Sequence, residues 1–119
     1  MADAYIALFL GTHTAPRAKE WDAMSDKERQ EKAKEGIEAW KAWAMKHQAS
    51  IVEMGGPCGK TKRISAAGIE DVRNAVGGFT IVRAASHAEA AKMFENHPHF
   101  TFFPGDSVEV MPIMPAPAG

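Results

Sequence analysis

The apolar positions of the chain fall into four short runs that predict strands. Residues 4–10 (Ala-Tyr-Ile-Ala-Leu-Phe-Leu) are almost continuously apolar and end at Gly11, which is typical of a strand buried on both faces. Residues 78–84 (Gly-Phe-Thr-Ile-Val-Arg-Ala) are rich in β-branched and aromatic side chains. Residues 50–54 and 107–111 are shorter runs of the same kind. We expect these four segments to form one sheet.

A capping box starts the first predicted helix. In Ser25-Asp26-Lys27-Glu28, the serine hydroxyl can accept a hydrogen bond from a first-turn amide while the glutamate reaches back to the serine amide. The helix is expected to continue to about Gln48. Four positions recur along one of its faces: Ile37, Trp40, Ala44 and His47. Gly36 lowers helix propensity by about 1 kcal/mol relative to Ala, so it indicates a close approach or a bend.

A second capping box, at residues 86–89, predicts a shorter helix that stops before Pro98. This helix is expected to bury Ala90, Ala91 and Phe94. Residues 97–105 (His-Pro-His-Phe-Thr-Phe-Phe-Pro-Gly) then read as an aromatic connection bounded by prolines, which leads into the last strand.

Three segments carry weaker signals. Residues 12–24 indicate a loop with one helical turn around Trp21, residues 62–65 a short return strand or irregular stretch, and residues 68–77 a loop. The order is then strand, helix, strand, possible short strand, strand, helix, strand. This order predicts the ferredoxin-like α+β fold, an antiparallel sheet with both helices on one face. A second copy can cover the other face, so we expect a homodimer.

Composition narrows the class of protein. The 119 residues, 45% of them hydrophobic, support one compact core, and we expect a single domain over residues 1–111 with a Pro-rich tail at 112–119. The 14 basic and 15 acidic side chains give no field that would hold nucleic acid or an anionic membrane. With a single cysteine, Cys58, and neither a signal peptide pattern nor a long apolar run, a cytoplasmic location is expected.

Residues 55–62, Gly-Gly-Pro-Cys-Gly-Lys-Thr-Lys, look at first like a phosphate-binding P-loop. That motif needs a glycine five positions before the final Gly-Lys-Thr, and the residue five before Gly59 is Met54, with Gly55 one position too close. No amphipathic helix pattern follows Thr61 to present its N-terminus to a phosphate. The sequence therefore does not predict a nucleotide site.

Residues 50–112 instead resemble the YCII-related family through an ordered set of short motifs. These are a strand, Gly-Gly-Pro, a polar loop, Gly-Gly-Phe-Thr-Ile-Val, a Ser-capped helix with Ala-Glu-Ala-Ala, His-Pro and Val-Glu-Val-Met-Pro. The resemblance implies a dimeric α/β barrel built from the ferredoxin-like unit, with a cleft near the dimer interface. It also implies a His-Asp pair in that cleft. Here the helix histidine would fall at Glu38 or Ala39, and the Asp-Pro step is matched by His97-Pro98.

His97 carries the catalytic hypothesis. At the end of the second helix its imidazole would be stabilised by the helix dipole, and Glu38 opposite it would complete a carboxylate–imidazole pair for acid–base work. The alternative is that His97 and His99 are polar loop residues that cap carbonyl groups. The predicted ligand-binding residues around the pair are Trp40, Trp43, His47, His99, Phe102 and Lys60. Core packing is the alternative role for the aromatic residues, and a solvated loop for Lys60, Lys62 and Arg63.

The sequence gives less support to a metal site, a haem site or a nucleophilic cysteine. A metal would need His97 and His99 together with Asp106, Glu109 or His13, and none of these stands at a recognised ligand spacing, so no metal is predicted. No histidine is singled out as an axial haem ligand, so no cofactor is predicted either. Cys58 is a nucleophile if a base lies beside it and an inert thiol otherwise.

Three functions stay open. The first is an acid–base enzyme of the lyase or hydrolase type that acts on a small organic compound. The second is a non-catalytic module of the same fold that binds a small ligand or assists another protein. The third is a structural dimer that acts through its Pro-rich tail. Fold alone does not separate them, because one fold carries many functions.

Overall fold

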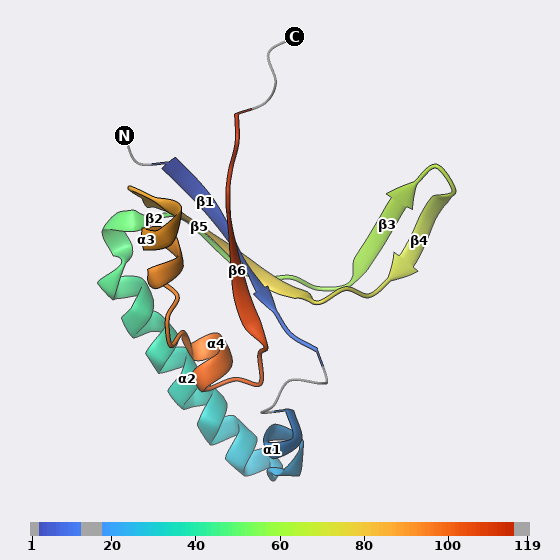
Figure 1. The fold of residues 1–119 in the computed structure, drawn as a ribbon. Helices are drawn as coiled ribbons and strands as arrows, with labels where there is room; N and C mark the ends of the chain where they lie inside the picture. The colour runs from blue at the N-terminus through green and yellow to red at the C-terminus, as the bar shows by residue number, and fades with distance from the viewer. Residues whose placement is uncertain (1–2, 13–17, 116–119) are drawn as a thin grey trace.

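A four-stranded antiparallel sheet forms the centre of the computed structural model, which describes residues 3–12 and 18–115 (Figure 1). Its strand order is β2–β5–β1–β6, so the strands that follow the two helical segments lie at opposite edges. The bounds are Asp3–Leu10 for β1, Ile51–Pro57 for β2, Val76–Ala84 for β5 and Ser107–Pro112 for β6. This is the ferredoxin-like order, and it confirms the predicted fold class. The last strand takes in Pro112, which was expected to begin the tail.

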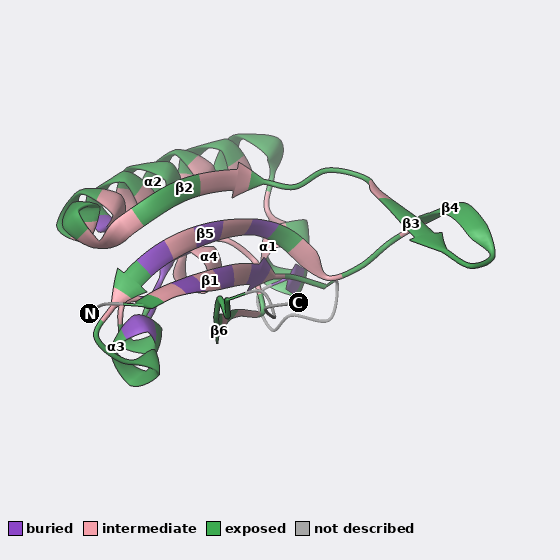
Figure 2. Cartoon of the chain, turned by 90° about the horizontal axis from the view of Figure 1, so that it is seen from above, coloured by how far each residue is buried: buried purple, intermediate pink, exposed green. Residues whose placement is uncertain are grey.

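A separate two-stranded sheet is inserted between β2 and β5. Its strands are β3 (Thr61–Ser65) and β4 (Gly68–Val72), which pair along their whole length. The return strand predicted at residues 62–65 is confirmed, whereas the loop predicted at 68–77 is wrong because it contains β4 and the start of β5. Gly68 has a φ of 110°, which lets the chain reverse within a very short turn. The hairpin stands away from the main sheet (Figures 1 and 2).

Helix α2 (Asp26–Lys46) begins at the predicted capping box, α3 (His87–Lys92) follows Ser86 as predicted, and α1 (Ala18–Ala23) contains the helical turn expected around Trp21. Helix α4 (Pro98–Thr101) was not predicted, since residues 97–105 were expected to form a connection. A 3-10 turn covers Gln48–Ser50. At the start of α2, the amide of Glu28 donates to Ser25 Oγ at 3.1 Å and the amide of Ser25 donates to Glu28 Oε1 at 3.2 Å, so the capping box is formed. None of the described helices has the length and apolar content needed to cross a membrane.

The hydrophobic core lies between one face of the sheet and the helices. Along β1 and β5 buried positions alternate with partly exposed ones (Figure 2), as expected for strands with one covered face. Trp43 of α2 packs into this core, and its indole Nε1 donates to the carbonyl oxygen of Met93 at 2.6 Å. Ala90 and Phe94 are buried as predicted, but Ala91 is exposed, because α3 turns that side chain toward solvent.

Gly36 marks a close approach, as its position in a long helix predicts. A Cβ atom at this position would lie 2.5 Å from the ring of Phe103 and 3.2 Å from Cβ of Phe102. The glycine thus lets α2 come close to the segment that follows α4. This contact holds the aromatic connection of residues 97–105 against the middle of α2 and helps to shape the site described below.

The other face of the sheet, called here the open face, carries no described helix. Its apolar side chains belong to the strand positions that alternate with the core: Ile6, Leu8, Phe79, Ile81 and Met111. The register places Ile6 beside both Ile81 and Met111, and Leu8 beside Phe79. These neighbours form a continuous apolar strip, and Met111 remains 40% exposed.

Candidate functional site

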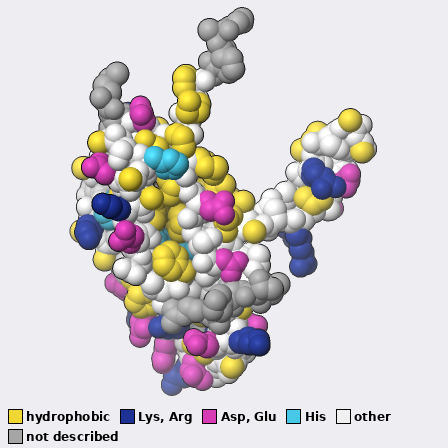
Figure 3. All heavy atoms as spheres, in the orientation of Figure 1, with side chains coloured by type: hydrophobic (Ala, Val, Ile, Leu, Met, Phe, Trp, Pro, Cys, Tyr) yellow, Lys and Arg dark blue, Asp and Glu magenta, His cyan; other side chains and the backbone are white. Residues whose placement is uncertain are grey.

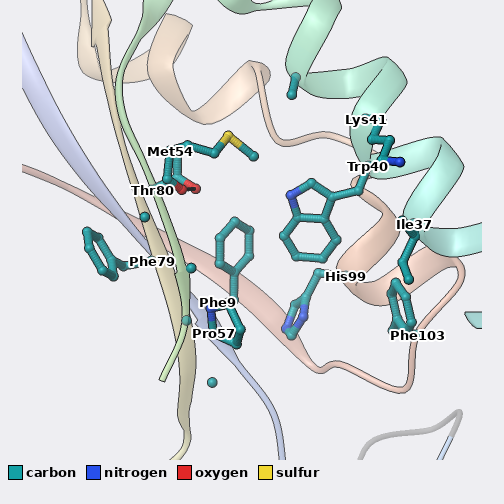
Figure 4. A pocket seen from close by; sticks show the side chains of 15 residues that line it. Phe9, Ile37, Trp40, Lys41, Met54, Pro57, Phe79, Thr80, His99 and Phe103 are labelled. Carbon is teal, nitrogen blue, oxygen red and sulfur yellow. Dashed lines mark hydrogen bonds between the residues drawn. The ribbon is translucent and has the colours of Figure 1, made fainter. Parts of the chain in front are cut away.

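A cavity of about 780 Å³ lies between α2 and the ends of β2 and β5 (Figure 4). Helix α2 supplies one wall with Ile37, Trp40, Lys41 and Ala44, and residues 54–57 and 77–80 supply the other. Phe9 of β1, together with His99 and Phe103 from the α4 region, completes the lining. The volume falls within the range of about 300 to 1,000 Å³ that is usual for small-molecule sites.

Glycines allow close backbone contacts within the sheet wall of the cavity. Gly55 has a φ of 66°, and a side chain there would collide with the carbonyl oxygen of Phe79. A Cβ at Gly78 would lie 2.9 Å from the carbonyl oxygen of Gly56, so the two strands cross closely at this point. Gly56 pairs with Phe79, so its Cβ would point to the other face of the sheet, where it would meet nothing within 4 Å.

The lining is mostly apolar and aromatic. In Figure 4, Phe9, Trp40 and Phe103 surround the ring of His99, with Met54 on the opposite side. Among the described lining residues, the polar side chains are Lys41, Thr80 and His99. The hydroxyl of Thr80 donates to the carbonyl oxygen of Met54 at 2.8 Å, so its proton is already engaged. Lys41 and His99 are thus the side chains best able to bind a polar group of a ligand.

Two hydrogen bonds fix the orientation of His99. Its ring Nε2 lies 2.7 Å from the carbonyl oxygen of Leu10, and since a carbonyl can only accept, Nε2 carries the proton and donates. Its backbone amide donates to Nδ1 of His97 at 3.0 Å. In the neutral ring, Nδ1 of His99 then keeps its lone pair, and no hydrogen bond occupies that atom within the described part of the chain. His99 can therefore accept a proton inside an apolar cavity.

His97 lies in the core beneath this cavity, with 0% of its surface exposed. It is the N-cap of α4, since its Nδ1 accepts the His99 amide, so in the neutral ring Nε2 carries the proton. Four aromatic rings surround it, with Trp40 edge-on at 4.4 Å between ring centroids and Trp43 at 4.7 Å. Burial, with smaller contributions from the charges of His99 and His47, lowers the pKa of His97 to about 3. His97 is therefore neutral near pH 7.

The expected pair of His97 and Glu38 does not form. Glu38 is exposed on α2, whereas Nε2 of His97 is buried and has no hydrogen-bond partner among the described residues. The helix dipole was expected to stabilise a protonated His97 at the C-terminus of a helix. It acts in the opposite sense, because His97 lies at the N-terminus of α4 and not at the C-terminus of α3. The error arose because α3 already ends at Lys92, and Pro98 is instead the first residue of α4.

Of the six predicted ligand-binding residues, Trp40 and His99 line the cavity. The others lie outside its lining: Trp43, His47, Phe102 and Lys60. Trp43 packs in the core with its ring 5.2 Å from that of His47, and burial lowers the pKa of His47. Phe102 lies under the ammonium group of Lys32 at 5.0 Å, and Lys60 is exposed in the link between β2 and β3.

Sequence reasoning missed the residues that shape the cavity. Phe9 and Phe103 were expected in a strand and a connection, and no periodicity links them to Trp40. The available signal was the pair of Gly-Gly steps, Gly55-Gly56 and Gly77-Gly78, each adjoining a predicted strand. Glycine inside a strand often marks a close backbone approach, and here the two steps lie on neighbouring strands.

The remaining candidate residues from the sequence form surface ion pairs or are simply exposed to solvent. Lys62 pairs with Asp71 at 2.7 Å and Arg63 with Glu70 at 2.8 Å across the β3–β4 hairpin, so these cations are not gathered around an anion site. Cys58 is exposed, and its amide donates to the carbonyl oxygen of Gly77 at 2.9 Å. Within residues 3–12 and 18–115, no group of three His, Cys, Asp or Glu side chains could hold a metal ion, and His13 lies outside those residues.

Comparison with known proteins supports the fold and leaves the family open. The sequence matches no protein-family model and no curated protein. Among solved structures, it is similar to 5-chloro-2-hydroxyhydroquinone dehydrochlorinase (TftG) from Burkholderia phenoliruptrix AC1100, in complex with 2,5-dihydroxybenzoquinone. The two chains are 16% identical with a TM-score of 0.51, over 91% of this chain and 90% of that chain. This likeness shows a related fold, and a YCII family assignment stays a hypothesis.

Proposed function

We propose that this protein binds a small hydroxylated aromatic or quinone ring in the cavity and acts on it by proton transfer through His99. The observation that carries the proposal is an imidazole, fixed by a hydrogen bond to Leu10, inside an otherwise apolar cavity lined by Phe9, Trp40 and Phe103. Aromatic walls favour a flat ring through stacking and area burial. The cavity volume is ample for a single substituted ring.

The polar groups set what the site can do chemically. Nδ1 of His99 can take a proton from a ring hydroxyl or an activated ring carbon and return it elsewhere, which is the work of an elimination or a tautomerisation. Lys41 at the same cavity can attract the negative charge that develops on a ring oxygen. TftG, whose printed name is that of a dehydrochlorinase of a chlorinated hydroxyhydroquinone, supports this ligand class through its related fold.

A non-catalytic binding module is the second candidate. It is favoured by the absence of an acidic side chain among the described residues that line the cavity, which leaves His99 without a carboxylate partner. An imidazole alone can still orient a ring hydroxyl by a hydrogen bond. The two candidates share the ligand and differ only in whether His99 exchanges a proton that changes the compound.

Self-association over the open face is part of the same proposal. The apolar strip of Ile6, Leu8 and Ile81 is left partly exposed in the single chain, and a second copy of the same sheet offers a matching surface. A dimer of this kind agrees with the arrangement that the YCII-like motifs imply.

The binding test compares ring compounds with a shape-matched control. We expect hydroquinone and 2,5-dihydroxybenzoquinone to bind in calorimetric titrations, and 1,4-cyclohexanediol, which lacks the aromatic ring, to bind at least about tenfold more weakly. His99→Gln should reduce hydroquinone binding, and His87→Gln, a change at an exposed imidazole, should leave it unchanged. Equal binding of all three compounds, or an unaltered affinity in His99→Gln, would rule the proposal out.

Turnover separates the enzyme from the binding module. If wild type changes the absorption spectrum of a halogenated hydroxyhydroquinone and releases halide while His99→Gln does not, His99 takes part in the reaction. If wild type binds the compound and returns it unaltered, the binding module is the correct function. Halide release that persists undiminished in His99→Gln would assign the chemistry to another group.

A further inference from the structure

The β3–β4 hairpin exposes an apolar pair at its outer end. Ile64 and Ile69 lie opposite each other in the register and are 73% and 70% exposed. Figure 3 shows hydrophobic side chains at the tip of this projection, with charged side chains closer to its base. Because both side chains are exposed to water in the single chain, their apolar area contributes little hydrophobic stabilisation there.

The hairpin has little to stabilise it alone. Its two cross-strand ion pairs are largely solvated, with Lys62 69% and Asp71 86% exposed, and such pairs contribute about 0 to 1 kcal/mol. An isolated two-stranded ribbon is marginally stable in water at best. A protein surface that buried the Ile64–Ile69 pair would therefore stabilise the hairpin.

The molecule is less compact and has more accessible surface than an average protein of its size. The radius of gyration is 16.3 Å, against about 13.5 Å for a compact chain of this length. The accessible area is 8437 Å², against about 6,300 Å² for a compact protein of this mass. The excess of about 2,000 Å² is of the order that one chain loses in a large, obligate dimer interface.

The position of the hairpin indicates what covers it. In Figure 1 the hairpin projects from the main sheet on the side away from α2. Most large hydrophobic side chains with high exposure lie outside the cavity, on the strands or just after β6: Val52, Ile64, Ile69, Met111, Ile113 and Met114. A molecule packed on the open face would fill the angle between the sheet and the hairpin.

We infer that the β3–β4 hairpin is a clasp that grips a second copy of this chain, with Ile64 and Ile69 packed against the partner that covers the open face. In a dimer with two-fold symmetry, the hairpin of each chain contacts the partner, and the same chain is contacted by the partner's hairpin. The four charges on β3 and β4 cancel within the hairpin through the Lys62–Asp71 and Arg63–Glu70 pairs. A neutral, apolar tip suits another apolar protein surface and not an anionic partner.

Sedimentation equilibrium of the full chain tests the clasp. We expect wild type to be a dimer, and Ile64→Ser with Ile69→Ser together to raise the dimer dissociation constant at least about tenfold, with the circular dichroism spectrum unchanged. Met45→Ser is the matched control, because Met45 is 74% exposed on α2, away from the open face, and should leave the constant unchanged. A monomeric wild type, or the same constant in the Ile64/Ile69 variant as in wild type, would overturn the inference.

A second variant separates the clasp from the sheet contact. Leu8→Ser on the open face should also weaken the dimer, and a dimer sensitive to Leu8→Ser but not to Ile64→Ser with Ile69→Ser would contradict the clasp while keeping the sheet contact. A spin label at Ile69→Cys, in a Cys58→Ser background, gives a direct readout. The clasp predicts that its mobility falls on dimerisation, and a label that stays freely mobile in the dimer would count against it. None of these measurements needs a ligand, so their outcome is independent of the proposed cavity function.

Discussion

The backbone amide of His99 donates a hydrogen bond to Nδ1 of His97 at 3.0 Å, so a buried imidazole sets the start of the helix that carries the cavity imidazole. The bond requires the lone pair of His97, and protonation of Nδ1 would break it. His99 is held at its other end by the carbonyl oxygen of Leu10 at 2.7 Å. The geometry of the cavity thus depends on a residue that does not line it.

The first prediction concerns acid stability. The pKa of His97 falls from 6.5 to about 3 in the folded chain because of burial, so the unfolded chain binds the extra proton first as the pH is lowered. The contribution of His97 to stability is complete above about pH 6.5 and declines as the pH falls toward 3, by up to about 1.4 kcal/mol per pH unit. Urea unfolding of wild type and His97→Asn between about pH 4 and pH 7 should show a shallower slope in the variant.

The control for this slope is Val82→Ala, which weakens the same core without removing an imidazole. Its stability should be lower than that of wild type but should fall with pH along a parallel line. If His97→Asn and wild type lose stability at the same rate as the pH falls, then His97 is not kept neutral by the fold and the described core packing is wrong at this point.

The second prediction uses two alanines of α2. Ala44 lines the cavity, whereas Ala42 is exposed outside its lining. Ala44→Leu should therefore narrow the cavity and weaken binding of hydroquinone by about tenfold or more. Ala42→Leu should bind like wild type. Equal affinity of the two variants in calorimetric titration would place the ligand elsewhere.

The third prediction concerns the contact between α2 and the segment after α4. Gly36→Ala places a methyl group 2.5 Å from the ring of Phe103, and overpacking of this kind costs about 1 to 3 kcal/mol. In an unstrained helix the same change would stabilise by about 1 kcal/mol. Chemical denaturation decides the sign, and the double variant with Phe103→Leu should recover much of the loss. A stabilised Gly36→Ala would show that the two segments are farther apart.

The fourth prediction tests the indole hydrogen bond of the core. Trp43→Phe removes the donor that reaches the carbonyl oxygen of Met93 at 2.6 Å and leaves a small void, which together should cost about 2 to 4 kcal/mol. Trp21→Phe, at a partly exposed ring packed near Phe103, is the comparison and should cost much less. Matching losses in thermal unfolding would mean that the Trp43 hydrogen bond adds little.

Local chemistry made most of the fold predictable. Ser25 and Glu28 marked the start of α2 because a capping box is a short-range interaction, and the apolar runs at residues 4–10 and 78–84 became the two central strands. Strand β4 escaped prediction because Gly-Ile-Glu-Asp-Val alternates weakly and pairs only with an equally polar neighbour. Its formation depends on the turn at Gly68, which carries no strand pattern of its own.

The candidate site was only partly predictable. Trp40 was predicted from the 3.6-residue repeat of the helix, and His99 because an imidazole is a common catalytic or ligand-binding group. The pairing of His97 with Glu38 depends on a distance in space, which the spacing of residues along the chain does not determine. The sequence does not say whether a histidine before a proline ends one helix or caps the next. Burial decided the outcome, since four aromatic rings close around His97.

Strand β2 lies at an edge of the main sheet, and its pairing with β5 shifts twice, between Ile51 and Glu53 and again between Glu53 and Gly56. An irregular edge offers incoming strands no continuous row of amide and carbonyl groups. The irregular pairing around Gly55, in the wall of the cavity, thus also discourages the sheet from growing into fibrils. A sequence change that made this edge regular would endanger solubility as well as the ligand site.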